Sequence, residues 1–479
     1  MLRSAGIYFS TRVLAAALAL LSVSVFTRLV PPDVYGVYTL VMSTAIAIFA
    51  IAYQWLRASV LRFVPGNNGT PKATLQAALA GYLLVSLLLM IVAGLATLAG
   101  LFPVAGPVIG LGLAVTLAYA AMEIVLASWQ ARKRPRIYAI LTLSRAAGTL
   151  LLGAVLTVSG FGAEGLLAGI LIANVAPIAA VRLFAGTHLP ELRFDRSRLR
   201  KIAAFGLPLG LVGIGGTIIA LSDRYLLAHL IGFDAAGAYS APYDLAQRSL
   251  SVLMLSAFLA YSPHVFGSYG EGKLGECREA ISSQLTLSLA FALPMAMVMA
   301  GAAPLIASIL FGEEFRASAT EVLPWIALSS LLQGIQSYHV SYGFTLPKRA
   351  GINASIVAGG ALLNLPLNFL LIPPLGIVGA AIATIVSYAT VLAISLLVTR
   401  RWIALPWPLR DMTKIALACI AGLPFVILAD RSPSIPTGLL WLIAAGAVVA
   451  GIYLATDMFG MRKMVLRKLA GRRRGGGGE

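Results

Sequence analysis

Charged residues are scarce in this chain, and their scarcity indicates what class of protein it is. Asp, Glu, Lys and Arg make up 11% of the 479 residues, whereas an ordinary soluble protein carries about 25%. The hydrophobic fraction is 59% and the mean hydropathy is +0.90, which is more apolar surface than the core of one chain can hide from water. The composition therefore excludes a soluble multidomain protein and indicates a membrane protein.

Cysteine and histidine are also rare. Cys277 and Cys419 are separated by several hydrophobic segments, so the sequence offers neither a disulfide framework nor a cysteine metal motif. The four histidines are scattered, and His339, between Tyr338 and Tyr342, is more typical of a packed helix residue than of a proton relay. No exposed loop is long enough for an extracytoplasmic active site, so we expect no catalytic residues, no metal and no enzyme.

Long apolar segments, in contrast, are abundant. About 20 apolar residues can cross a bilayer as a helix, and fourteen such segments fit the sequence. The first is followed by Arg28 and a Pro31-Pro32 turn without a small-residue cleavage site, so we expect a retained helix and not a signal peptide. The spans lie near residues 9–29, 38–61, 75–99, 107–130, 137–159, 164–185, 205–230, 237–264, 279–301, 320–344, 350–372, 376–398, 411–429 and 437–457.

Basic residues fall almost entirely on one side of these spans. Of the 36 Lys and Arg residues, 28 lie in the termini and loops on the N-terminal side, and only Arg316 and Arg431 lie in the opposite loops. Because cytoplasmic loops retain Lys and Arg, we expect both termini in the cytoplasm. Residues 192–205 interleave basic and apolar side chains, which is typical of an interfacial helix on anionic lipid or of an ordinary basic loop. Nothing in the basic tail suggests nucleic-acid binding.

Two sequence matches indicate an internal repeat. LVPPDVYGVY at 29–38 is similar to LIGFDAAGAY at 230–239, and GFGAEGLLAG at 160–169 is similar to PLGIVGAAIA at 374–383. The matches predict two parallel six-helix halves with a substrate site between them near the midplane. We therefore expect an N-terminal lobe over 1–186, a cytoplasmic amphipathic linker over 187–204, a C-terminal lobe over 205–405, two further spans within 406–460 and a basic cytoplasmic tail over 461–479.

Nine charged residues are predicted to lie inside the spans. Each would cost about 2.5–3.5 kcal/mol at a helix centre in lipid, so these side chains must face protein or water. Six cations against three anions leave a positive excess, which favours an anionic substrate, because unpaired arginines bind phosphate and a transporter of cationic drugs would present carboxylates. The residues are Arg12, Arg28, Arg57, Arg145, Arg224 and Arg248, with Glu123, Asp223 and Asp244.

Depth and spacing suggest partners for some of these charges. Glu123 and Arg145 are matched in depth on neighbouring spans, and they are predicted to form a neutralising pair. Asp244 and Arg248 lie at i and i+4 on one helix face and can also pair.

The remaining arginines are ranked by whether they can reach water. Arg12, and less readily Arg57, lies close enough to the cytoplasmic face to extend its side chain toward it. Arg28 and Arg224 are the best candidates for binding the ligand, because Asp223 and Arg224 are adjacent, point in different directions and cannot simply neutralise each other.

Polar residues are weaker candidates for contacts with a sugar. Asn364 and Asn368 lie at i and i+4 beside Pro366 and either bind sugar hydroxyls or form hydrogen bonds with a neighbouring helix. Gln54 and Trp55 lie near Arg57 and either contact a sugar face or, for the tryptophan, anchor the span at the interface.

Four segments carry a further signal: TRLVPPDVYGVY after the first span, QWLRASVLRFVP at the end of the second, the stretch containing SDRYLLAHLIGFDAAGAY around the seventh, and NLPLNFLLIPPLGIVGAAIATIVSY across the eleventh and twelfth. Together they resemble the polysaccharide exporters of the multidrug/oligosaccharidyl-lipid/polysaccharide (MOP) flippase superfamily. The resemblance covers about residues 1–405. It implies a Wzx-type flippase of the bacterial inner membrane, with a MATE-like fold of two six-helix lobes, that moves undecaprenyl-pyrophosphate-linked oligosaccharide to the periplasmic leaflet by alternating access.

The resemblance also implies roles for individual residues. Arg28 and Arg57 are similar in position to the cavity arginines of such flippases, and Arg224 lies in the family's Ser-Asp-Arg stretch. These arginines are expected to hold the pyrophosphate while the polyprenyl chain stays in lipid, and we place Arg248 with them as a further substrate-binding candidate.

No cofactor is expected beyond coupling to a proton gradient, a sodium gradient or the membrane potential, with Glu123, Asp223 or Asp244 as the coupling group. A glycan polymerase and assembly proteins are the expected partners. A fourteen-span arrangement is also similar to the lipid II flippase branch, whose extra pair forms a groove for the lipid tail. A multidrug antiporter of the same superfamily is a second alternative, which the interior cations disfavour. A membrane glycan polymerase or ligase is a third, which the short loops disfavour.

Overall fold

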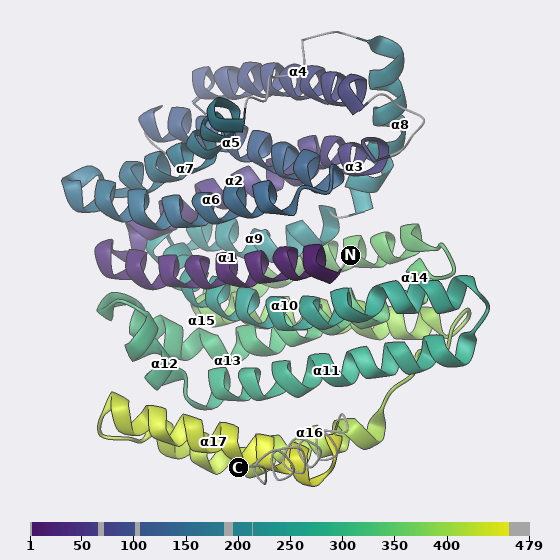
Figure 1. Ribbon diagram of the computed structural model, residues 1–479. Coiled ribbons are helices and arrows are strands. Elements are labelled where there is room, and N and C mark those ends of the chain that lie inside the picture. The colour runs from purple at the N-terminus through teal and green to yellow at the C-terminus, as the bar shows by residue number, and fades with distance from the viewer. Residues whose placement is uncertain (1, 66–70, 101–105, 186–194, 213, 459–479) are drawn as a thin grey trace, which may run out of the picture. The chain divides into compact units, whose positions relative to one another are not determined.

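The computed structural model describes residues 2–65, 71–100, 106–185, 195–212 and 214–458, and within these ranges every regular element is helical (Figure 1). The elements are α1 (Leu2–Leu29), α2 (Pro32–Ile48), η1 (Phe49–Tyr53), α3 (Gln54–Phe63), α4 (Pro71–Leu98), α5 (Gly106–Ala131), α6 (Pro135–Leu156), η2 (Thr157–Phe161), α7 (Gly162–Ala185), α8 (Arg196–Val212), α9 (Ile214–Leu230), α10 (Phe233–Gly270), α11 (Leu274–Gly301), α12 (Ala303–Leu310), α13 (Glu313–Ile335), η3 (Gln336–Val340), α14 (Tyr342–Thr345), α15 (Ala350–Thr399), α16 (Leu409–Asp430) and α17 (Ile435–Ala455), where η marks a π-helical turn. The predicted tail, 461–479, and residues 187–194 of the predicted linker lie outside the described residues.

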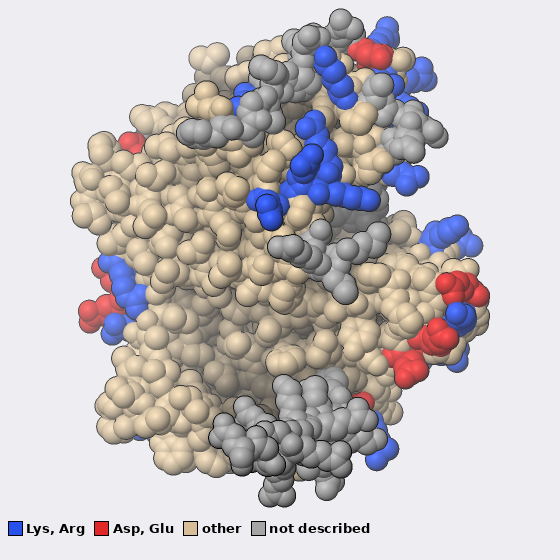
Figure 2. Space-filling view, in the orientation of Figure 1, with Lys and Arg blue, Asp and Glu red and all other residues tan. Residues whose placement is uncertain are grey.

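The predicted membrane-spanning helices are confirmed. In the described part of the chain, ten helical segments are long and apolar enough to cross a membrane. Two of them, 135–183 and 350–399, each contain two expected spans joined at a sharp non-helical turn, and α9 and α13 occupy the two positions that are left. Figure 2 shows charged side chains gathered mainly at helix ends, with largely uncharged surface along the helices. The protein is therefore an all-α, multi-pass membrane protein of about fourteen spans.

The two sharp turns have the same backbone geometry. Gly162 has φ 49° and ψ −129°, and Gly376 has φ 57° and ψ −136°. The second sequence match aligns these two glycines, and their conformation is one that residues with a Cβ rarely adopt. Three residues later, a Cβ on Gly165 or on Gly379 would lie 2.9 or 2.1 Å from a carbonyl oxygen of the preceding helix. Both turns therefore require glycine at the same two positions.

The first sequence match forms a reciprocal contact between α2 and α10. A Cβ on Gly36 would lie 1.9 Å from the Phe233 carbonyl oxygen, and a Cβ on Gly237 would lie 1.9 Å from the Pro32 carbonyl oxygen. Each glycine thus touches the backbone at the start of the other helix. The repeat that the sequence indicates is therefore also present in the way the two motifs pack.

Packing divides the chain into two compact units. Unit 1 comprises residues 1–245, 311–318 and 350–391, and unit 2 comprises 246–310, 319–349 and 392–479. These units follow spatial packing, whereas the predicted lobes follow the sequence repeat, so the lobe boundaries stay a prediction. Nearly all of the predicted intramembrane charges lie in unit 1; Arg248 lies in unit 2.

Helices α8 and α9 cover the described part of the predicted seventh span, 205–230, on either side of residue 213. Figure 1 shows α8 running crosswise to α3 and α4. It packs against α3, where the Ser59 hydroxyl donates a hydrogen bond of 2.8 Å to the Ile202 carbonyl and Phe63 lies 5.3 Å from Phe205.

A capping carboxylate fixes the start of α8. Asp195 Oδ1 accepts hydrogen bonds from the Ser197 and Arg198 backbone N–H groups at 3.0 and 3.1 Å and from the Ser197 hydroxyl at 2.7 Å. These bonds to the ionised form lower the pKa of the Asp195 carboxyl. From residue 195 onward, the segment predicted to be either an interfacial helix or a loop is thus a capped helix that packs on protein.

Candidate functional site

Two arginines share one glutamate in the interior of unit 1. The Arg145 Nη1 atom on α6 donates a hydrogen bond of 2.8 Å to Glu123 Oε1 on α5, and the Arg57 Nε atom on α3 lies 3.6 Å from Glu123 Oε2. Arg145 also lies 5.9 Å from the ring centre of Tyr119. The predicted pairing of Glu123 with Arg145 is confirmed, and Arg57 joins it. We call Arg57, Glu123 and Arg145 the shared-glutamate cluster.

The local fold of α3 turns Arg57 toward this cluster. The π-helical turn η1 comes directly before Gln54, and such turns change the direction of the side chains that follow them. Trp55 is 8% exposed within a core of helices α3, α4, α5 and α8, and its Nε1 atom donates to the Ala52 carbonyl at 2.8 Å. The tryptophan is therefore a core residue, neither an interface anchor nor a surface for a sugar, while Gln54 is half-buried at the start of α3.

The charges of the shared-glutamate cluster do not balance. Two guanidinium groups face one carboxylate, and the side chains of Arg57, Arg145 and Glu123 are 30%, 24% and 16% exposed. Arg57 lies at ion-pair distance from Glu123 but beyond the length of a hydrogen bond. The cluster thus combines a net positive charge, access to solvent and guanidinium donors that an anion can engage.

Arg224, by contrast, is neutralised. Its Nη2 atom lies 2.5 Å from Asp244 Oδ1, its Nη1 atom donates to the Ser43 hydroxyl at 3.3 Å, and its guanidinium lies 5.2 Å from the ring centre of Tyr243. The side chains of the pair are 6% and 15% exposed. The expectation that Arg224 lacks a partner is therefore wrong, because the short turn between α9 and α10 brings Asp244 beside it. The predicted pairing of Asp244 with Arg248 stays a prediction.

Asp223 points away from Arg224, as predicted, into a buried polar network. Its carboxylate accepts hydrogen bonds from the Tyr239 hydroxyl at 2.8 Å, the Thr384 hydroxyl at 2.5 Å and the Asn368 Nδ2 atom at 2.8 Å. Asp223, Asn368, Tyr239 and Thr384 are all 0% exposed. In the described residues Asp223 forms no ion pair, so the network holds a carboxylate without a basic partner.

The asparagines are part of this network. Asn364 Oδ1 accepts a 2.7 Å hydrogen bond from the Ser222 hydroxyl and a 3.0 Å bond from Asn368 Nδ2. Of the two interpretations of Asn364 and Asn368, the hydrogen bonds between helices are therefore the one present. The Asn368 Oδ1 atom is buried and accepts no hydrogen bond from the described residues.

Sequence reasoning missed Tyr239 and Thr384 as partners of Asp223. Tyr239 closes the repeated motif that matches Tyr38, and this match was the available signal. Thr384 gave no comparable signal, since an isolated threonine in an apolar helix most often bonds to its own backbone.

The other candidate residues lie elsewhere. Arg28 is exposed near the end of α1, and its Nη1 atom bonds to the Ser24 carbonyl and hydroxyl at 2.6 and 2.5 Å. Arg248 is exposed on α10. His339 is 1% exposed and lies edge-on to Trp407 at 5.0 Å, which agrees with its interpretation as a packed helix residue.

Two relatives align over part of their length. The chain is 24% identical over 313 residues to the uncharacterized membrane protein MJ1068 of Methanocaldococcus jannaschii, covering 62% of this chain and 58% of that protein. It is 28% identical over 243 residues to the probable low-salt glycan biosynthesis flippase Agl15 of Haloferax volcanii, covering 50% of this chain and 49% of that protein. The alignments thus span less than two thirds of either relative.

Solved structures with low sequence identity share the fold. A structure of the lipid II flippase MurJ in an inward closed conformation is similar with a TM-score of 0.75 and 14% identity, over 97% of this chain and 100% of that chain. An inward-facing multidrug resistance MATE family transporter of the MOP superfamily is similar with a TM-score of 0.62 and 15% identity, over 81% of this chain and 94% of that chain. The MATE-like fold implied by the sequence resemblance is confirmed.

The family profile described as polysaccharide biosynthesis protein matches residues 25–320, which is more than half of the chain. The matched region contains Arg28, the shared-glutamate cluster and the Arg224–Asp244 pair. The chain therefore belongs to the polysaccharide biosynthesis protein family and has the fold of the MOP flippase superfamily.

Proposed function

We propose that the protein is a flippase that moves undecaprenyl-pyrophosphate-linked oligosaccharide from the cytoplasmic to the periplasmic leaflet by alternating access. The observation that carries this proposal is the shared-glutamate cluster, in which Arg57 and Arg145 contact a single carboxylate. A pyrophosphate is a multivalent anion whose oxygens match guanidinium donors. Family membership and the similarity to a protein named as a glycan biosynthesis flippase support the same substrate class.

The geometry suggests how the anion binds. Arg57 is held by Glu123 at 3.6 Å, whereas Arg145 forms a hydrogen bond of 2.8 Å with it. The pyrophosphate engages Arg57 first, because Arg57 has the weaker interaction with the Glu123 carboxylate and gives up less binding energy when it moves away. Glu123 then keeps Arg145 oriented and limits the affinity of the site for the pyrophosphate, so that the anion can be released at the periplasmic leaflet. Arg28, which is exposed on α1, stays a further candidate for binding the substrate.

We predict that Arg57→Gln lowers transport at least about tenfold, the magnitude expected for one lost charge-assisted contact. The measurement is the translocation of fluorescent lipid-linked oligosaccharide in proteoliposomes that contain equal amounts of folded protein. Arg62→Gln is the matched control, since Arg62 is an exposed arginine on the same helix. Equal rates for Arg57→Gln and wild type would contradict the proposed pyrophosphate site.

Asp223 is the candidate that we propose for coupling transport to an ion gradient. Glu123 and Asp244 each face an arginine at 2.8 and 2.5 Å, whereas Asp223 faces hydroxyl and amide groups only. A proton would neutralise this carboxylate. A sodium ion also fits the oxygen donors present, since hard cations take carboxylate, amide and hydroxyl oxygens, and the buried Asn368 Oδ1 atom has no other partner among the described residues. In the bound state Asp223, Asn364, Asn368 and Thr384 would hold the ion, which would supply the positive charge that the carboxylate lacks.

We predict that Asp223→Asn abolishes the response of transport to an imposed proton or sodium gradient, because the neutral amide no longer gains a charge partner. Translocation is measured with and without each gradient, and thermal unfolding is recorded for the same preparations. Asp411→Asn is the control, since Asp411 forms a partly exposed pair with Lys414 at 3.0 Å. A gradient response in Asp223→Asn equal to that of wild type would exclude Asp223 as the coupling group.

A lipid II flippase is the second candidate, favoured by an apolar cavity in unit 2. The cavity has a volume of about 370 Å³ and lies among α11, α13 and α16, with Met297, Leu328 and Ile420 in its lining. It can receive part of a polyprenyl chain. Parallel translocation assays with lipid II and with lipid-linked oligosaccharide separate the two functions. A multidrug antiporter is disfavoured by the net positive shared-glutamate cluster, and cationic dye efflux tests it.

A further inference from the structure

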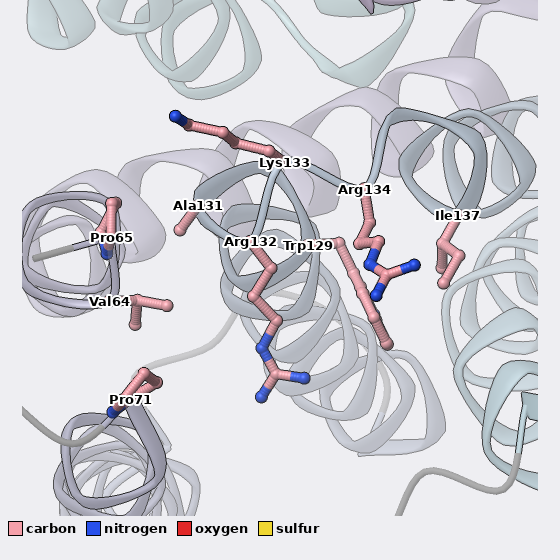
Figure 3. A pocket seen from close by; sticks show the side chains of 9 residues that line it. All are labelled: Val64, Pro65, Pro71, Trp129, Ala131, Arg132, Lys133, Arg134 and Ile137. Carbon is pink, nitrogen blue, oxygen red and sulfur yellow. The ribbon is translucent and has the colours of Figure 1, made fainter. Parts of the chain in front are cut away.

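A basic cavity lies at the turn between α5 and α6 in unit 1. It has a volume of about 780 Å³. Its lining includes Trp129 from α5 and Arg132, Lys133 and Arg134 from the turn, with apolar residues from the end of α3, from α4 and from α6. Figure 3 shows Arg132 and Arg134 extending to the same side of the turn, on either side of Trp129, whereas Lys133 extends the other way. Both arginines thus line the same cavity.

Among the described residues, the arginines of this cavity have no acidic partner. Among the residues that line it none is acidic, and in the described part of the chain neither Arg132 nor Arg134 forms an ion pair. The Arg132 guanidinium lies 5.2 Å from the ring centre of Trp129, which orients it without neutralising it. A phosphate group in this cavity would supply the missing negative charge.

The backbone of the turn fixes this arrangement. The Lys133 N–H donates to the Gln130 carbonyl at 3.0 Å and the Arg134 N–H donates to the Trp129 carbonyl at 3.1 Å, which are the two bonds of a Schellman helix end. Lys133 occupies the left-handed position with φ 55°, where glycine is usual. This conformation sends Lys133 away from its neighbours and leaves Arg132 and Arg134 on one side.

An apolar groove adjoins the basic cavity. The groove has a volume of about 270 Å³ and lies among α4, α5 and α7; Trp129 and Arg132 line both spaces. Its other lining residues are almost all apolar, and its one further cation is Arg182. Along α5 and the residue after it, the lining runs from Ala121 to Arg132, a rise of about 16 Å at about 1.5 Å per residue. That is half of a hydrocarbon core about 30 Å thick, so the groove has the depth of one leaflet.

We propose that the cavity and the groove form one binding site for an anionic membrane phospholipid, with the phosphate in the basic cavity lined by Arg132 and Arg134 and an acyl chain in the groove. A basic pocket joined to an apolar groove one leaflet deep matches the two parts of such a lipid. The site lies on the side of the basic loops, where the lipid would enter from the same leaflet. The bound lipid would contact α4, α5 and α7 at once and so stabilise their packing. This proposal does not depend on the proposed transport activity.

The test measures lipid binding to the purified full-length protein. Native mass spectrometry compares phosphatidylglycerol with phosphatidylcholine of the same chain length, and thermal unfolding is recorded with each lipid. We expect tighter retention of phosphatidylglycerol by wild type and a weakening of at least about tenfold for Arg132→Gln or Arg134→Gln, as for a lost charge-assisted contact. Lys133→Gln removes the same charge from the same turn but from the opposite side, and it should change retention less than about threefold.

A second variant tests the groove. Ser128→Phe places an aromatic side chain among the groove residues while leaving the arginines intact, so it should weaken phosphatidylglycerol binding without weakening the binding of glycerol phosphate. Equal losses for Lys133→Gln, Arg132→Gln and Arg134→Gln would overturn the proposal, since they would indicate general attraction to a basic surface. Tight binding of inorganic phosphate with no preference for lipid would overturn it as well, and so would preferential retention of lipid-linked oligosaccharide over phosphatidylglycerol.

Discussion

Asp244→Ala is expected to lower the free energy of unfolding by about 3–5 kcal/mol, the cost of leaving a buried charge without its partner. The partner is Arg224, whose side chain is 6% exposed and lies 2.5 Å from Asp244. Ser43 at 3.3 Å and the ring of Tyr243 at 5.2 Å also contact Arg224 and carry no formal charge. The measurement is thermal or SDS-induced unfolding of the purified protein in a fixed detergent.

The control for this prediction is an exposed ion pair. Glu271 and Lys273 lie 2.8 Å apart with side chains 63% and 55% exposed, so Glu271→Ala should cost less than about 1 kcal/mol. The double variant Arg224→Met with Asp244→Leu removes both charges and should recover most of the lost stability. If Asp244→Ala destabilised the protein no more than Glu271→Ala, the pair would contribute nothing beyond an exposed pair.

Gly36→Ala is expected to destabilise the protein by about 2–3 kcal/mol or to prevent folding, because overpacking at a tight contact forces backbone movement. The new Cβ would lie 1.9 Å from the Phe233 carbonyl oxygen and 3.2 Å from the Gly237 nitrogen, and neither backbone atom can rotate away. Gly237→Ala should have a similar effect, since its Cβ would meet the Pro32 carbonyl oxygen at 1.9 Å. Unfolding is measured as for Asp244→Ala.

The control for Gly36→Ala is a glycine without close neighbours, at which alanine is expected to stabilise the protein. Gly94 lies within α4, and a Cβ there has no atom within 4 Å. Gly94→Ala should therefore raise stability by up to about 1 kcal/mol through helix propensity. A destabilisation by Gly94→Ala equal to that by Gly36→Ala would show that the close approach of α2 and α10 is not the cause.

The sequence was sufficient for the spans because hydropathy reports directly on lipid exposure. It also predicted the pairing of Glu123 with Arg145, since two charges at equal depth on adjacent helices have few other partners. It did not predict the crosswise helix α8, because apolar composition is the same for a helix that packs across its neighbours and one that lies along them. The turns at Gly162 and Gly376 were visible only as an aligned pair of motifs, and their backbone angles come from the structure.

The candidate site was less accessible to sequence reasoning. Arg224 was ranked above Arg57 as a ligand-binding residue, yet Arg224 has a full partner in Asp244 and Arg57 shares the carboxylate of Glu123. Depth along a helix is readable from sequence, whereas the direction of a side chain around the helix depends on local geometry. For Arg57 that direction is set by a π-helical turn, which cannot be recognised from the amino-acid composition of the segment.

This π turn sets the angular phase of the second span. The five residues Phe49–Tyr53 separate α2 from α3 within one continuous helical segment, and an α-helix advances about 100° per residue. A one-residue deletion in this turn would shorten the span by one residue and leave it apolar, but it would rotate Arg57 by about 100° away from Glu123. A related sequence can therefore keep all but one of the apolar residues of this span and still lose the cluster, so alignments in this region are informative only when they are gap-free across residues 49–57.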